Sequence, residues 1–144
     1  MPQIEFHFNA PERLHYVCRF LRKAHAHDWR VGVLGSEAVL RQLDAALWSF
    51  SEHDFLPHCT ANDSPHMQQA SAILLSPDVS RLAGWPMLVN LGDDVPEGFE
   101  QFQRVIEIVP SDDHGKMTAR QRWRHYAAQG FELTQHDLSK VATA

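Results

Sequence analysis

Cysteine, long apolar runs and glycine-rich motifs are all scarce in this chain. Its two cysteines, Cys18 and Cys59, cannot build a disulfide framework, and no CxxC pair is present. No apolar stretch approaches the roughly 18 residues of a membrane helix, and the N-terminus lacks the basic and apolar regions of a signal peptide. We therefore expect a cytoplasmic protein without a membrane span. Its 144 residues are enough for one domain, residues 1–144, with its own core.

The motifs of nucleotide-binding enzymes are missing as well. Asn9, Ala10 and Pro11 follow the first predicted strand where such enzymes carry glycines. Gly32 and Gly35 match neither GxGxxG nor GxxxxGK[ST], and no GxSxG nucleophile motif occurs. We expect no active site and no cofactor, and a small nucleotide-binding α/β enzyme stays as an alternative to be tested.

The ten histidines do not predict a metal site. His25 and His27 are two residues apart, so on a helix they point to different faces. A looser group in the middle of the chain also lacks a standard zinc spacing: His53, His58, Cys59 and His66. We interpret the histidines as surface or core residues and expect no bound metal.

Strand and helix patterns alternate along the chain. Residues 4–8 alternate apolar and polar side chains, which predicts a strand, and Asn9 is placed to cap the helix that follows. Segment 50–71 is mixed and polar, so we predict a surface loop there. Further strands are expected at 31–34, 72–75, 87–91, 105–109 and 131–134, with helices between several of them. This order predicts an α/β fold, a Rossmann-like three-layer sandwich with a mostly parallel sheet.

A basic segment, KMTARQRWRHY at residues 116–126, stands out from an otherwise acidic chain with 18 acids against 13 lysines and arginines. Lys116, Arg120 and Arg124 are spaced i, i+4 and i+8, so a helix places them on one face, with Trp123 at its edge. Such a surface suits an acidic ligand with an apolar end.

Two questions about this helix stay open at the level of sequence. The same pattern is typical of a solvated helix face whose cations complement the helix dipole. The helix start is also undecided between Asp112 and Thr118, because Gly115 weakens the longer version.

Direct binding of single-stranded nucleic acid is another alternative. Arg122 would then act as a fourth cation beside Lys116, Arg120 and Arg124, and Trp123 would stack on a base. The formal net charge of −5 opposes this interpretation, because a broadly basic surface drives most nucleic-acid binding.

Two segments resemble the chi subunit family of bacterial DNA polymerase III. The segment LDAALWSFSEHDFLPHC, residues 43–59, is similar to the Leu-Asp-x-x-Leu-Trp and Phe-x-Pro-His pattern of that family. The segment ARQRWRHYAAQGFEL, residues 119–133, resembles its arginine-rich helix, Gly-Phe turn and last strand. The likeness covers most of the chain, apart from roughly residues 60–71.

The resemblance implies a non-catalytic accessory of the clamp-loader assembly. Chi proteins have a Rossmann-like fold without nucleotide chemistry. They pair with the psi subunit and bind the acidic C-terminal tail of single-stranded-DNA-binding protein, which ends in Pro-Phe. In some bacteria a repair helicase is the partner instead. Contact with DNA would then be mainly indirect.

The resemblance also assigns roles to residues. Lys116, Arg120 and Arg124 match the basic positions that face the carboxylates of the tail. Trp123 stands where the family has an aromatic, often Tyr, beside the pocket for the terminal Phe, and Val109 matches an apolar position of that pocket.

The psi-binding surface is assigned on fewer residues. Phe55, in the signature segment, is our candidate anchor for psi. Trp48 is a second candidate, but we interpret it as a core residue.

Overall fold

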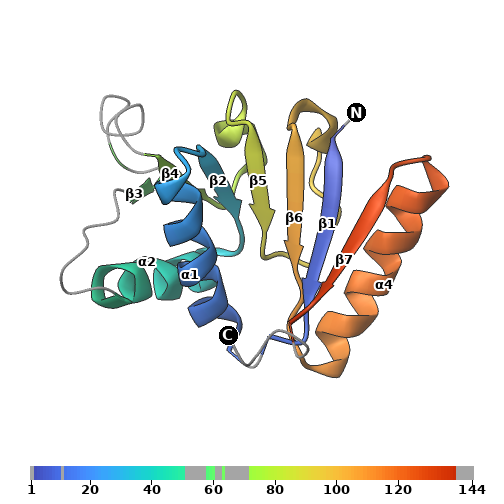
Figure 1. Ribbon diagram of the computed structural model, residues 1–144, viewed down its shortest axis with the longest axis horizontal. Coiled ribbons are helices and arrows are strands. Elements are labelled where there is room, and N and C mark those ends of the chain that lie inside the picture. The colour runs from blue at the N-terminus through green and yellow to red at the C-terminus, as the bar shows by residue number, and fades with distance from the viewer. Residues whose placement is uncertain (1, 11, 51–57, 61–62, 64–71, 139–144) are drawn as a thin grey trace.

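A seven-stranded sheet forms the centre of the protein (Figure 1). The computed structural model describes residues 2–10, 12–50, 58–60, 63 and 72–138. The strands are β1 (Gln3–Phe8), β2 (Val31–Leu34), β3 (His58–Thr60), β4 (Ile73–Ser76), β5 (Met87–Asn90), β6 (Arg104–Ile108) and β7 (Leu133–Asp137). The helices are α1 (Arg13–Ala26), α2 (Glu37–Phe50) and α4 (Asp113–Ala128), with 3₁₀ turns η1 (Val79–Leu82) and η2 (Phe99–Gln101).

The strand order is β3-β4-β2-β5-β6-β1-β7, and every neighbouring pair is parallel. This arrangement confirms the predicted α/β Rossmann-like fold. Within the described ranges, no helix combines the length and the apolar character that crossing a bilayer requires.

Helices cover both faces of the sheet and make three layers. One core cluster joins α1 and α2 to one face through residues such as Leu21, Leu43 and Val33. The other joins α4, η1 and η2 to the opposite face through residues such as Tyr126 and Phe6. Alternate side chains of β4, β5 and β6 supply the two clusters, because successive residues of a strand point to opposite faces.

The edges of the sheet differ from the sequence prediction. Strand β3 lies inside the segment predicted as a loop, and the rest of that segment lies almost wholly outside the described residues. At the other edge, β7 begins at Leu133 and runs to Asp137, later than the predicted 131–134.

The predicted cap of α1 by Asn9 is wrong. Helix α1 begins after Glu12, and no side chain caps it. Asn9 has a positive φ of 62°, and its amide donates a hydrogen bond to Asp137 at 3.0 Å. Asn9 therefore turns the chain after β1 and ties it to the end of β7.

Helix α4 takes the longer of the two predicted forms. Asp112 caps it by accepting a hydrogen bond from the Gly115 N–H at 2.6 Å, so the cap offsets the weakness of a glycine in the first turn. At the other end, Gly130 has a φ of 85°, and the N–H groups of Gly130 and Phe131 bond to Ala127 and Tyr126. This C-terminal motif needs a left-handed residue, which explains the predicted glycine stop.

A buried polar network fixes α4 on the sheet. The carboxylate of Glu107, on β6, is fully buried and accepts hydrogen bonds from Arg122 Nε at 3.0 Å and from the Tyr126 hydroxyl at 2.7 Å. The Asn90 amide, on β5, donates to the same carboxylate. In the described part of the chain, no buried side-chain nitrogen or oxygen lacks a hydrogen-bond partner.

The pKa directions follow from this burial. Burial raises the pKa of Glu107, and the charge of Arg122 with the hydrogen bonds from Tyr126 and Asn90 opposes the rise. Burial and the neighbouring carboxylate raise the pKa of Tyr126, which keeps its hydroxyl a donor.

We predict that Arg122→Met strongly destabilises the protein. The change leaves the Glu107 carboxylate without its buried counter-ion, which costs about 3–5 kcal/mol of unfolding free energy. Arg120→Met on the same helix is the matched control, because Arg120 is exposed, and it should change stability by less than about 0.5 kcal/mol. Urea denaturation of both variants measures the difference. Equal stabilities would contradict the role given to the network.

Candidate functional site

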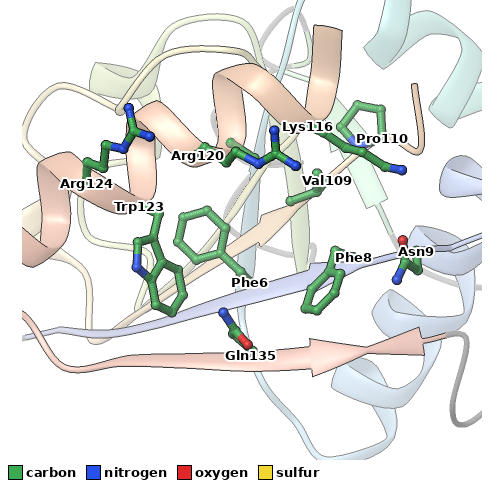
Figure 2. Close-up of a pocket in the computed structure, with 11 residues that line it drawn as sticks. Phe6, Phe8, Asn9, Val109, Pro110, Lys116, Arg120, Trp123, Arg124 and Gln135 are labelled. Atoms are coloured by element: carbon green, nitrogen blue, oxygen red, sulfur yellow. The ribbon is translucent and has the colours of Figure 1, made fainter. Parts of the chain in front are cut away.

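A groove opens between α4 and the edge of the sheet formed by β1 and β7 (Figure 2). Its volume is about 440 Å³. All five residues that the sequence assigned to a tail-binding site line this groove: Val109, Lys116, Arg120, Trp123 and Arg124. The structure adds Phe6, Phe8, Asn9, Pro110, Ala119 and Gln135 to its lining.

The floor of the groove is apolar and aromatic. Phe6 and Phe8 project from β1 on the α4 face of the sheet, since they are two residues apart on a strand. The Trp123 ring packs edge-on against Phe6, with ring centroids 5.2 Å apart. Val109, just after β6, is buried beside them. The partly buried Trp123 thus both packs on the core and presents a surface to the groove.

Cations form the rim. Lys116, Arg120 and Arg124 lie on successive turns of α4 and are exposed above the apolar floor (Figure 2). None of the described residues that line the groove is acidic. An anionic group at the rim would therefore meet positive charge while an apolar group reaches the aromatic floor.

The sequence alone did not predict that β1 and β7 contribute residues to the groove. The alternation over residues 4–8 places Phe6 and Phe8 on one face, but it does not say which face α4 covers. Gln135 enters the groove through the pairing of β7 with β1, in which Phe6 and Gln135 are register partners. That pairing joins segments from the two ends of the chain.

Arg122 does not belong to the rim. Its side chain is 2% exposed and bonded to Glu107, so it is not available as the fourth cation of a direct nucleic-acid site. That part of the alternative interpretation is wrong.

Trp48 is also placed differently from the prediction. Its side chain is 59% exposed on α2, so the interpretation as a core residue is wrong. The preceding residue, Leu47, faces the core instead. Phe55, the candidate anchor for psi, lies outside the described residues.

The crevice where Rossmann-like folds bind nucleotides has the wrong charge for phosphate. A second cavity lies at the carboxyl ends of β2 and β5, and its lining includes Asp78, Asp93, Asp94 and Glu97. Ser36, at the start of α2, uses its hydroxyl to accept a bond from the Val39 N–H. Acidic side chains repel a phosphate, and the cap occupies one helix amide that would otherwise bind it.

The start of α4 packs closely against Pro110. A Cβ added at Gly115 would lie 2.7 Å from the Pro110 ring, which is too close for a real contact. Glycine at this position therefore lets the helix approach the end of β6 and sets the position of Pro110 at the groove.

The fold and the site together define a parallel α/β protein whose exposed groove combines an aromatic floor with a basic rim. The sequence profile of the DNA polymerase III chi subunit family matches residues 1–134. The chain belongs to this family.

Similar proteins agree with that assignment. The DNA polymerase III subunit chi of Pseudomonas aeruginosa is 31% identical over 134 residues, covering 90% of this chain and 89% of the relative. The subunit chi of Haemophilus influenzae is 30% identical, covering 72% and 71% of the two chains. That of Escherichia coli is 28% identical, covering 75% and 76%.

The fold also resembles that of a domain from a DEAD-box protein. The C-terminal domain of the DEAD-box protein Dbp5 superimposes with a TM-score of 0.58, covering 96% of this chain and 91% of that chain. The sequence identity is 12%, so this likeness concerns the fold alone.

We predict that Gly115→Ala destabilises the protein although alanine is the better helix former. Helix propensity alone would favour alanine by about 1 kcal/mol, whereas overpacking against the Pro110 ring costs about 1–3 kcal/mol. A net loss of about 1 kcal/mol is expected in urea denaturation. In a Pro110→Gly background the same change should stabilise the protein, because every ring carbon that the new Cβ would meet, Cβ of residue 110 included, is gone. A stabilising effect in the natural background would refute the close packing.

Proposed function

We propose that the protein is a non-catalytic subunit of the DNA polymerase III clamp-loader assembly that binds the acidic C-terminal tail of single-stranded-DNA-binding protein in the groove beside α4. Membership of the chi family provides the polymerase context. The observation that carries the proposal is the groove itself, in which an aromatic floor and a rim of cations lie within reach of one short peptide.

The chemistry of the groove matches an acidic peptide ending in an aromatic residue. The terminal Phe would pack between Trp123 and Val109 over Phe6, where it loses contact with water. Arg120 and Arg124 would pair with the terminal carboxylate and the acidic side chains, with Lys116 continuing the rim. The apolar anchor supplies most of the affinity, and the exposed cations supply orientation and association rate.

The affinity should be modest and sensitive to salt. A short peptide buries little area, so a dissociation constant on the order of micromolar is expected. Exposed charge pairs are screened at physiological ionic strength, so binding should weaken between low and physiological salt.

The absence of catalysis is part of the same proposal. Two features support it: the acidic lining of the crevice at β2 and β5, and the turn after β1, where Asn9 stands without a glycine loop. We extend the proposal to a repair helicase as a further partner, on the family likeness alone.

The exposed face of α2 supports a second contact, with the psi subunit. Trp48 is 59% exposed there, and large aromatic side chains are enriched at protein interfaces. Trp48 belongs to the same family-like segment as Phe55, the other candidate anchor. This surface lies on the face of the sheet opposite α4, so psi and the tail could bind at the same time.

We predict that Arg124→Glu weakens binding of the acidic tail by at least about tenfold. The change places a negative charge where the peptide is negative, and Arg124 is exposed, so the fold should tolerate it. Fluorescence anisotropy of a labelled acidic peptide ending in Pro-Phe measures the affinity at low and physiological salt.

Arg41→Glu is the matched control, because it makes the same charge change at an exposed position of α2. It should leave the affinity within about twofold. Equal losses in both variants would indicate a non-specific charge effect. Tighter binding of a labelled single-stranded oligonucleotide than of the peptide would favour the direct nucleic-acid interpretation.

We predict that Trp48→Ala lowers the affinity for psi by at least about tenfold, because it truncates an interface aromatic. Isothermal titration calorimetry with purified psi measures the effect, and tail binding should not change. Met117→Ala is the control, since Met117 is half exposed on α4, on the other side of the sheet. A psi affinity that depends on Met117 and not on Trp48 would move the interface to α4.

A further inference from the structure

Three metal-ligating side chains meet on the face of the sheet opposite the groove. Glu5 and His7 are two residues apart on β1, so both point to the α1 face. His136 on β7 is the register partner of His7 and points to the same side, with ring centroids 4.5 Å apart. One ligand atom of each residue lies within 4.8 Å of the other two. We call these residues the Glu5–His7–His136 cluster.

The spacing of the ligand atoms suits a tetrahedral metal. Glu5 Oε1 lies 3.4 Å from His7 Nε2 and 3.3 Å from His136 Nε2. Both distances are long for an N–H···O hydrogen bond. They agree with the separation of about 3.4 Å between neighbouring ligands of a tetrahedral ion whose bonds to N and O are about 2.0–2.1 Å long.

Each buried ligand is held by a partner through its other polar atom. His7 Nδ1 forms a hydrogen bond with the Tyr16 hydroxyl, on α1, so Nε2 is left to face Glu5 and His136. Glu5 Oε2 accepts two hydrogen bonds from Arg104, at 2.6 and 2.9 Å, so Oε1 is left to face the histidines. Protein metal sites orient their ligands with such outer contacts.

Glu5 supplies a carboxylate to the cluster, and the Arg104 guanidinium lies against the oxygen that faces away from the histidines. Arg104 reduces the net negative charge of the site. The donor set of two imidazoles and one carboxylate therefore matches a borderline-soft ion such as zinc better than calcium or magnesium, which need several hard oxygens.

One side of the cluster is open to solvent. The His136 side chain is 49% exposed, whereas those of His7 and Glu5 are 7% and 12% exposed. A cavity lined by Gln3, Glu5, Thr134 and His136 leads to it. Three protein ligands leave a fourth tetrahedral position on this open side, which a water molecule would take.

We propose that Glu5, His7 and His136 bind one zinc ion, which links the edge strand β7 to β1. The ion would join two strands from opposite ends of the chain. Because β7 is an edge strand that pairs with β1 alone among the described strands, the site would stabilise this edge of the sheet. The proposed zinc site does not depend on peptide binding, since its residues lie on the face of the sheet opposite the groove.

Zinc titration of the tag-free, full-length protein tests the proposal. After chelator treatment, isothermal titration calorimetry with zinc chloride should show one site per chain that requires the cluster. His136→Ala should weaken this binding by at least about tenfold, because it removes one of three ligands. Zinc should raise the melting temperature of the natural protein, through binding to the folded state, and should raise that of the variant less.

His114→Ala is the matched control. His114 lies 3.4 Å from the Asp93 carboxylate, so it is an exposed histidine–carboxylate pair to which no third ligand is assigned among the described residues. It should bind zinc like the natural protein. Cobalt substitution gives a second measurement, since a tetrahedral site produces strong visible absorption that His136→Ala should remove. No zinc binding at 100-fold excess over protein, about 1 mM, would overturn the proposal. So would equal zinc affinity in His136→Ala, which would place the ion elsewhere.

Discussion

The Glu107 carboxylate is the constraint on which the placement of α4 depends. It sits without solvent contact on β6, and two of its donors, Arg122 and Tyr126, come from consecutive turns of α4. A buried charge without such donors would be costly, so the helix has one rotation that satisfies the network. That rotation turns Arg122 into the protein and leaves Arg120 and Arg124 facing the groove. A buried interaction thus decides which cations are available at the surface.

Much of the fold could be predicted from the sequence because its signals are local. Alternating residues on β1 and the 3.6-residue period of α4 are properties of short segments, and Gly130 marks the helix end by its backbone conformation. The strand β3 and the full length of β7 could not be predicted in the same way. Edge strands depend on pairing with a neighbour, and their own sequences carry a weak pattern.

The cations of the candidate site could also be predicted from a local signal, the spacing of residues along one helix. Lys116, Arg120 and Arg124 share a face by spacing alone, whereas Arg122 differs from them only through Glu107, fifteen residues away on β6. The sequence could not distinguish these arginines. Likewise, Trp48 follows the core residue Leu47, and the direction in which α2 faces decides which of them is buried. Both errors concern tertiary orientation.

Successive residues of strand β1 point to opposite faces of the sheet. The strand therefore contributes to the groove on one face and to the proposed metal site on the other. Phe6 supports the groove under α4, while its neighbours Glu5 and His7 point toward α1. Strand β7 repeats the division, with Gln135 in the groove and His136 in the proposed metal site. Neighbouring residues of β1 and β7 therefore place an aromatic ring and an amide on one face and metal-ligating side chains on the other. Since the groove carries its positive charge on α4, an acidic ligand can approach it although the whole chain has a net charge of −5.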